Sequence, residues 1–135
     1  VEDVRSNGSV RSLKGRKCRF DMWEPRGFQL NKALPREEAL AAYGPTTQLR
    51  RAYTYKSLNR LIQASAADMT KQAMVDVYRA GTTPLLQIHD ELACSVRDEG
   101  QAREIATIME NAVSIAVPSK CDIDLGPSWG EAEEV

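Results

Sequence analysis

Apolar residues recur at helical spacing between Arg51 and Ala80, a stretch that contains neither glycine nor proline and that Gly81 closes. Spacings of mostly three and four residues predict an amphipathic helix, and Gly81 stands where a C-terminal cap belongs. The next residues after Gln63 are small, so that another backbone or a ligand can lie close to this helix. The apolar positions are Leu58, Leu61, Ile62, Met69, Ala73 and Val77, and the small ones are Ala64, Ser65, Ala66 and Ala67.

The same predicted helix carries a polar stripe formed by Lys56, Asn59 and Gln63, which are spaced three and four residues apart. A solvated helix face is the simplest explanation of such a stripe. However, asparagine and glutamine are less expected there than lysine and glutamate, and their amides both donate and accept hydrogen bonds. The stripe is therefore a candidate binding surface.

Residues 84–96 alternate between apolar and polar positions on both sides of His89-Asp90-Glu91, which predicts a β-hairpin with Asp90 and Glu91 at its tip. Hairpin tips usually need a positive φ, which Asp-Glu satisfies poorly. Adjacent carboxylates on a rigid ribbon suit a hard divalent cation such as Mg²⁺, which prefers oxygen ligands. A solvated turn that happens to be acidic is the alternative.

The remaining elements are shorter. We predict a turn and a strand-like or irregular arm over residues 1–20, and a surface connection over residues 21–50 with a short helix from Pro35 to Tyr43. Asp98 and Gln101 form a capping box for another helix, which Pro118 ends. Its apolar face comprises Ile105, Ile108, Ala112 and Ile115, and residues 121–125 alternate as a closing strand.

This order of elements predicts an α+β fold, an antiparallel sheet with helices on one face. At 135 residues the chain is one domain by length, and its 42% hydrophobic and 27% charged residues are ordinary for a soluble globular protein. No apolar stretch approaches the roughly 20 residues that span a bilayer, and no signal peptide opens the chain, so we expect no membrane partner.

Three cysteines, at positions 18, 94 and 121, favour a reducing compartment over a disulfide framework, and we expect a cytoplasmic protein. His89 is the only histidine, and no Cys/His spacing suggests zinc.

Charge is unevenly distributed although the formal net charge is only −1. Basic residues gather in two clusters near the front, whereas acids gather late, at residues 98–110 and 131–134. A basic front suits a protein that faces phosphate on one side, and a solvated charge run is the alternative. The clusters are Arg5, Arg11, Lys14, Arg16, Lys17 and Arg19, and then Arg50, Arg51, Lys56 and Arg60.

Several motifs together resemble family A DNA polymerases, the DNA polymerase I family. Asn59-x-x-x-Gln63-x-Ser65-Ala66-Ala67-Asp68, followed by Gln87-Ile88-His89-Asp90-Glu91-Leu92, looks like the palm of that family, and the hairpin matches its third conserved motif. Residues 8–17 resemble the segment that leaves the fingers, and Val117-Pro118 with residues 126–130 resemble the C-terminal strand and tail. Residues 20–27 and 37–40 resemble the bacteriophage-type branch. Four motifs in order, from about residue 8 to 130, make the resemblance specific.

The resemblance implies residues 1–50 as the end of the fingers with a connecting arm, and residues 51–135 as a palm subdomain. The expected palm has an antiparallel sheet, made of the acid-tipped hairpin and the closing strand, packed on long helices. One departure is Tyr55, which occupies the place of an arginine one helical turn before Asn59. A larger one is that the first and second motifs are not recognisable, so we expect an upstream polymerase portion to supply them.

The implied reaction is template-directed nucleotidyl transfer from deoxynucleoside triphosphates to primer–template DNA with two Mg²⁺ ions. Asp90 is the expected metal ligand. Glu91, on the opposite side of a strand, would act through water or primer positioning. The resemblance implies that His89 contacts the primer terminus, and a histidine hydrogen-bonded within the sheet is the alternative. Amide donors of Asn59 and Gln63 can test the minor-groove acceptors that every base pair presents. The residues expected to bind phosphate are Lys56, Arg60, Arg11, Arg16 and Lys17.

Three functions therefore compete. The first is the palm and fingers-exit portion of a DNA-directed DNA polymerase, inactive without the upstream motifs. The second is a non-catalytic nucleic-acid-binding or interaction module that keeps the palm fold. A metal-dependent phosphohydrolase would explain Asp90 and Glu91, but it leaves Asn59 and Gln63 unexplained. We assign Cys94, Met69 and Met74 to packing.

Overall fold

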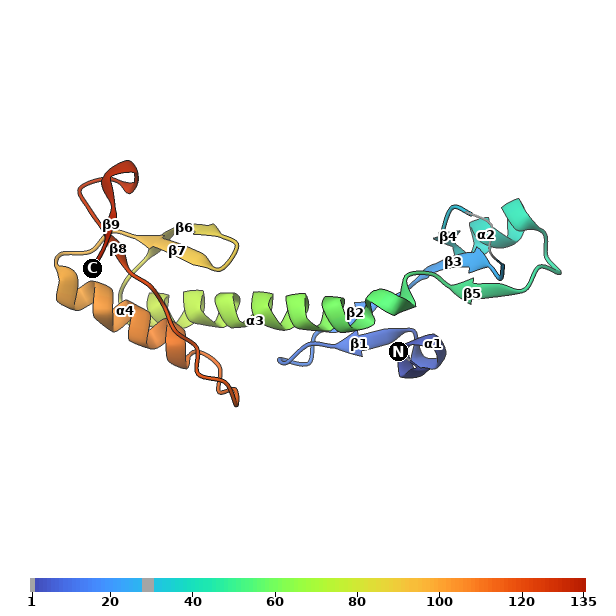
Figure 1. Ribbon diagram of the computed structural model, residues 1–135, viewed down its shortest axis with the longest axis horizontal. Helices are drawn as coiled ribbons and strands as arrows, with labels where there is room; N and C mark the ends of the chain where they lie inside the picture. Colours follow the sequence, from blue (N-terminus) through green and yellow to red (C-terminus); the bar gives the residue numbers. More distant parts are fainter. Residues whose placement is uncertain (1, 28–30) are drawn as a thin grey trace. The chain divides into compact units, whose positions relative to one another are not determined.

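The computed structural model describes residues 2–27 and 31–135 and has a mixture of helices and antiparallel sheets, as the α+β expectation requires (Figure 1). The chain divides into two compact units, residues 1–65 and 66–135, and each is described by itself below. The expected functional boundary after residue 50 is a different division and stays a prediction. None of the helices in the described residues is long and apolar enough to cross a membrane.

The first twenty residues are more regular than expected. Helix α1 spans Glu2–Asn7, and strands β1 (Ser9–Arg11) and β2 (Lys17–Arg19) form an antiparallel hairpin in which Val10 faces Cys18. Gly8 joins α1 to β1 at φ 68°, a left-handed conformation that glycine adopts without steric cost. Val4 and Phe20 are both buried. Of the two alternatives for this arm, the strand-like one is therefore confirmed and the irregular one was wrong, whereas helix α1 was not predicted.

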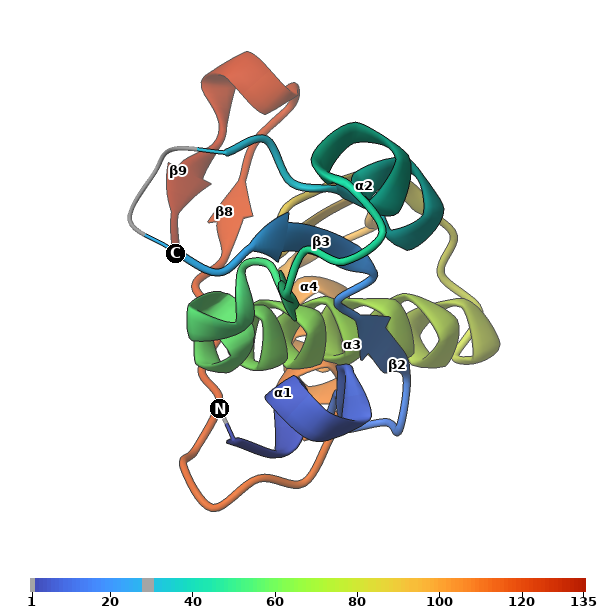
Figure 2. The ribbon, with the colours of Figure 1, turned by 90° about the vertical axis from the view of Figure 1, so that its right-hand side faces the viewer.

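Residues 21–51 contain the predicted short helix and a sheet that was not predicted. Helix α2 spans Arg36–Tyr43 and packs beside strand β3 (Met22–Pro25), as Figure 2 shows. Strand β3 lies between β4 (Leu34–Pro35) and β5 (Leu49–Arg51) in an antiparallel sheet. The sheet was not predicted because its strands are only two to four residues long and include two prolines, so they show no periodic pattern in the sequence.

The long helix α3 spans Ser57–Arg79, so it begins six residues later than predicted. Tyr53 has a positive φ of 60°, and a 3₁₀ turn, η1 (Thr54–Lys56), precedes α3. Lys56 therefore belongs to this turn and not to the α-helix. Leu58 and Ile62 are exposed, whereas Ala73 and Val77 are buried, so only the later part of the predicted apolar stripe is buried.

The C-terminal end of α3 agrees with the prediction. Gly81 has φ 93°, its N–H donates to the Tyr78 carbonyl at 3.0 Å, and the Thr82 N–H donates to the Val77 carbonyl at 3.2 Å. These two hydrogen bonds, with a left-handed glycine, define the Schellman motif. The local signal from Gly81 therefore determines where the helix stops.

Strands β6 (Pro84–Ile88) and β7 (Glu91–Cys94) form the predicted hairpin (Figure 1). The register shifts between Pro84 and Leu86, so Leu85 is an extra residue on β6. In the described residues β6 and β7 form a two-stranded sheet of their own.

Helix α4 spans Glu99–Asn111 and has the predicted cap, since the Asp98 carboxylate accepts from the Gln101 N–H at 2.8 Å. The side-chain oxygen of Gln101 accepts a hydrogen bond from the Arg97 N–H, whereas in a capping box the donor would be the Asp98 N–H. The helix stops well before Pro118, and Ile115 lies outside it.

The closing strand is also shorter than predicted. Strand β8 (Asp124–Leu125) pairs with β9 (Glu133–Glu134) and not with the hairpin, so the expected single palm sheet was wrong for the described residues. Residues 129–131 form a 3₁₀ turn, η2 (Trp129–Glu131), between them. All three cysteines are free thiols, as expected.

Candidate functional site

The hairpin tip consists of two turn residues, His89 and Asp90, since Ile88 pairs with Glu91 across the last rung of the ladder. His89 takes the positive φ, 54°, that the first position of a tight hairpin turn demands. Its carbonyl accepts a hydrogen bond from the Gln87 side-chain amide. Asp90 therefore keeps an ordinary backbone conformation at the apex of the hairpin.

This geometry corrects the expected tip, which was Asp90 and Glu91. Glu91 is the first residue of β7, and Asp90 lies in the turn, so strand alternation does not decide where the Asp90 side chain points. His89 is exposed and lies in the turn, outside both strands. Asp90 and Glu91 are exposed too, so all three side chains are open to a ligand.

The carboxylate oxygens at this tip are suitable ligands for a hard cation, but they do not form a complete metal site. Both carboxylates offer the oxygen ligands that Mg²⁺ prefers. Within residues 2–27 and 31–135, no group of three or more His, Cys, Asp or Glu side chains could hold a metal ion. The hairpin can therefore contribute one or two ligands of a set whose other members are not gathered around it here.

The polar stripe is exposed, as the sequence predicts. Asn59 and Gln63 project from α3 one helical turn apart, and Lys56 precedes them in η1. All three are accessible to solvent. The stripe lies in residues 1–65 and the hairpin in residues 66–135, two units that are each described by themselves.

The small residues that follow the stripe are approached by another backbone. The Ser65 hydroxyl accepts from the Leu13 N–H at 3.0 Å and donates to the Leu61 carbonyl at 2.8 Å. The Arg16 guanidinium donates to the Ala64 carbonyl at 2.9 Å. The loop between β1 and β2 therefore covers this part of α3. The small residues allowed either another backbone or a ligand to approach, and in the structure it is a backbone.

Several of the residues expected to bind phosphate also hold the fold together. Arg11 donates to the Gly15 carbonyl at 2.8 Å, within the β1–β2 hairpin. Arg60 donates to the Arg19 carbonyl at 2.7 Å, and its guanidinium lies 4.6 Å from the centre of the Phe20 ring. Both guanidinium groups are thereby fixed in direction. Lys17, on β2, is exposed.

Comparison with known proteins identifies the family. The family model of DNA polymerase family A matches residues 1–131. The chain belongs to DNA polymerase family A. A DNA-directed DNA polymerase of Pseudomonas phage M6 is 37% identical over 129 residues, which cover 96% of this chain and 16% of the relative.

Bacterial members of family A are similar too. The thermostable DNA polymerase I of Thermus aquaticus is 34% identical over 141 residues, covering 99% of this chain and 15% of that protein. The DNA polymerase I of Geobacillus stearothermophilus is 40% identical over 86 residues, or 57% of this chain and 10% of the relative. The chain thus spans only 10% to 16% of the length of these relatives.

In this family A chain, sequence reasoning missed one group of exposed residues. The Lys56 ammonium lies over two tyrosine rings, 5.4 Å from the centre of Tyr53 and 5.7 Å from that of Tyr55. The available signal was the run Tyr53-Thr54-Tyr55-Lys56, which places aromatic and basic side chains together directly before the polar stripe.

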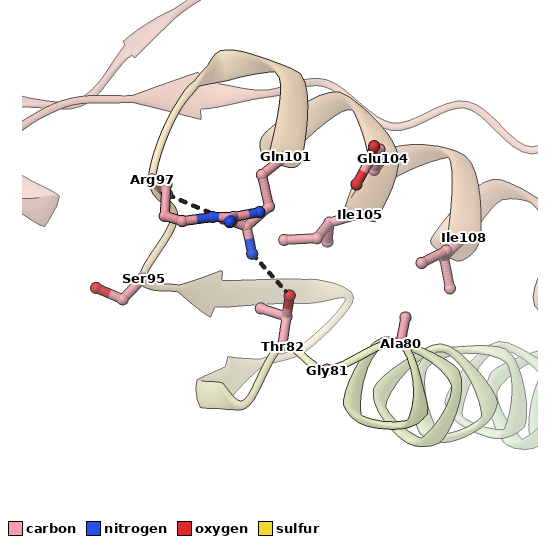
Figure 3. A pocket seen from close by; sticks show the side chains of 9 residues that line it. All are labelled: Ala80, Gly81, Thr82, Ser95, Arg97, Gln101, Glu104, Ile105 and Ile108. Atoms are coloured by element: carbon pink, nitrogen blue, oxygen red, sulfur yellow. Dashed lines mark hydrogen bonds between the residues drawn. The ribbon is translucent and has the colours of Figure 1, made fainter.

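A cavity of about 400 Å³ lies elsewhere in this family A chain, within residues 66–135 (Figure 3). Gln101 donates to the Thr82 hydroxyl at 3.0 Å, and the Arg97 guanidinium donates to Gln101 at 3.2 Å. None of the candidate residues lines this cavity. Its polar side chains connect α4 to the segment that enters β6, which is a structural role.

Proposed function

We propose that this chain is the palm and fingers-exit portion of a DNA-directed DNA polymerase, with residues 1–50 as the end of the fingers and residues 51–135 as the palm. One observation carries the proposal: in a chain that the family model matches over residues 1–131, Asp90 is exposed at the apex of an antiparallel hairpin. A carboxylate in that position is free to bind a metal ion and a substrate. The cytoplasm, including that of a host cell if the protein is viral, is the proposed location.

The proposed reaction is template-directed nucleotidyl transfer. The oxygen of the primer 3′-hydroxyl forms a bond to the α-phosphorus of a deoxynucleoside triphosphate, the hydroxyl proton passes to solvent, and the bond between the α-phosphorus and the leaving pyrophosphate breaks. Asp90 would provide a ligand for one or both of two Mg²⁺ ions, which would lower the pKa of the hydroxyl and neutralise charge at the leaving oxygens. Glu91 begins β7 beside Asp90 and would orient the primer end or a bound water.

His89 would contact the primer terminus. Its backbone conformation is held by the tight turn and by the hydrogen bond from Gln87 to its carbonyl, so the imidazole starts from a fixed backbone position. An exposed imidazole offers a donor and an acceptor to the sugar and phosphate of a primer.

Asn59 and Gln63 would face the minor groove of the newly formed base pairs. Purine N3 and pyrimidine O2 are acceptors at equivalent places in all four base pairs, so amide donors there sense pair geometry without reading sequence. Both amides are exposed one helical turn apart on α3, which allows a duplex to approach them. The exposed cations Lys56 and Lys17 would bind backbone phosphate, as would the guanidinium groups of Arg11, Arg16 and Arg60.

We further propose that the upstream polymerase portion must be present, in cis or as a separate chain, for synthesis. The reason is the incomplete ligand set: the described residues gather no group of three metal-binding side chains around Asp90. In a complete polymerase, defined here as this chain together with that portion, the remaining ligands would be supplied.

The test is Mg²⁺-dependent primer extension with the purified 135 residues and with the complete polymerase. We expect extension only from the complete polymerase. Robust synthesis by the 135 residues, free of contaminating polymerase, would refute the need for the upstream portion. A complete polymerase that binds primer–template but never extends it would favour a non-catalytic binding module instead.

A further inference from the structure

Two tyrosines directly before the long helix α3 have exposed side chains. Tyr53 is 41% and Tyr55 is 72% exposed, and the ammonium of Lys56 lies over both rings. These three residues are called the tyrosine–lysine cluster. A cation over an exposed ring is held weakly and can be replaced by another flat or charged group, so the cluster is open to a ligand.

The backbone of the cluster is strained. Tyr53 has φ 60° and ψ 14°, a left-handed conformation that a bulky residue rarely adopts. Such conformations persist where the surrounding structure demands them, and they concentrate at binding and catalytic sites. Here the left-handed residue separates β5 from η1 and positions Tyr53 beside Lys56.

The cluster is also in line with the polar stripe. The turn η1 continues into α3 through Ser57, whose φ of −59° and ψ of −42° are helical. Tyr55 lies in the 3₁₀ turn and precedes Asn59 by four residues and Gln63 by eight, close to the spacing of residues on one side of an α-helix. The aromatic ring therefore stands at one end of the row of amides.

The charge around the cluster suits a polyanion. Between Glu38 and Asp68 the chain has no acidic residue and four basic ones, Arg50, Arg51, Lys56 and Arg60, of which Arg50 forms an ion pair with Glu24 at 2.9 Å. Exposed rings beside cations are the combination with which proteins bind single-stranded nucleic acid, because every base has a face that can stack. Bases inside a duplex are already stacked, so such rings act where pairing ends.

We propose that the tyrosine–lysine cluster is a stacking platform for an unpaired base of the template strand. Tyr55, with Tyr53 beside it, stacks on a base just outside the duplex whose minor groove faces Asn59 and Gln63, and Lys56 neutralises the adjoining phosphate. This inference rests on the proposed function, and it adds the residues that would hold the first unpaired base of the template strand.

The test compares the affinity of the complete polymerase for a blunt duplex with its affinity for the same duplex carrying a template overhang, by fluorescence anisotropy at one fixed salt concentration. We expect wild type to prefer the overhang DNA. Tyr55→Ala should weaken binding to the overhang DNA by about five- to 150-fold while leaving the blunt duplex nearly unaffected. Tyr55→Phe keeps the ring and should behave as wild type.

Tyr78→Ala is the matched control, because Tyr78 is 65% exposed on the same helix and lies outside the cluster. Equal loss in Tyr55→Ala and Tyr55→Phe, equal weakening on both DNAs, or an equal effect in Tyr78→Ala would overturn the stacking platform. If wild type binds both DNAs equally, this inference fails and the proposed function stands. If wild type binds neither DNA, the proposed function fails with it.

Discussion

Replacing Gly8 by alanine should destabilise the N-terminal unit through one identifiable contact. Gly8 has φ 68°, and a Cβ atom added there would lie 2.5 Å from the Arg51 Cζ atom. The Arg51 guanidinium lies 4.5 Å from the centre of the Trp23 ring and donates to the Phe20 carbonyl at 3.0 Å. Gly8→Ala must therefore displace Arg51 from both partners.

The magnitude follows from separate contributions. A left-handed backbone costs an L-residue about 1–2 kcal/mol. Loss of the hydrogen bond from Arg51 costs about 1 kcal/mol, and loss of the cation–π contact with Trp23 about 0.5–1 kcal/mol. Gly15 provides the matched control, since it has φ 81° and no atom within 4 Å of an added Cβ. We expect Gly8→Ala to lower the free energy of unfolding by about 3 kcal/mol and Gly15→Ala by about 1–2 kcal/mol.

Urea unfolding followed by the fluorescence of Trp23 measures both variants. The chain has two tryptophans, so a Trp129→Phe background leaves Trp23 as the only reporter. In an Arg51→Ala background, Gly8→Ala should cost no more than Gly15→Ala, because there is no guanidinium to displace. Equal costs of the two glycine substitutions in the chain with Arg51 would refute the reasoning.

Two further predictions concern the polar stripe and a thiol. Gln63→Ala should change the free energy of unfolding by no more than about 0.5 kcal/mol, because the side chain is exposed. In the complete polymerase, however, the same substitution should slow the extension of matched primers and impair fidelity. A sharp drop in thermal stability with normal kinetics would make Gln63 structural. Burial, and then the charges of Glu110 and Asp122, raise the pKa of the Cys121 thiol. Glu110→Gln should therefore lower that pKa, increase the thiolate fraction at pH 8 and speed alkylation by iodoacetamide, whereas Cys94, whose pKa is raised by burial alone, should react as before. An unchanged Cys121 rate would contradict this electrostatic contribution.

The sequence predicted the fold correctly where an element depends on residues that are close together in the chain. The Gly81 cap and the Asp98 cap both depend on residues within five positions of one another, and both have the expected hydrogen bonds. The start of α3 was missed because Tyr53 adopts a left-handed conformation that no tyrosine signals in advance. The β3–β5 sheet was missed because it depends on non-local pairs, such as Glu24 with Arg50 at 2.9 Å, that no spacing along the chain reveals.

For the candidate site, the sequence predicted the hairpin and the exposed helix face, but not the conformation of the turn. The hairpin and the exposed amides of Asn59 and Gln63 have the expected positions. The turn lies one residue earlier than expected, because His89 takes the positive φ that was expected only of glycine or asparagine. The arginines were assigned to phosphate from charge alone, and charge does not show that Arg60 also donates to a carbonyl of the fold.

The central claim is that Asp90 provides a metal ligand for nucleotidyl transfer, and single-turnover incorporation by the complete polymerase tests it most directly. Asp90→Asn preserves the size of an exposed side chain, so primer–template affinity and thermal stability should stay near wild type. Loss of transition-state charge stabilisation worth several kcal/mol should reduce incorporation by roughly a thousandfold or more. Asp122→Asn, at another exposed aspartate, should incorporate at the wild-type rate. An Asp90→Asn variant that keeps a tenth of the wild-type rate would show that Asp90 is only a turn residue.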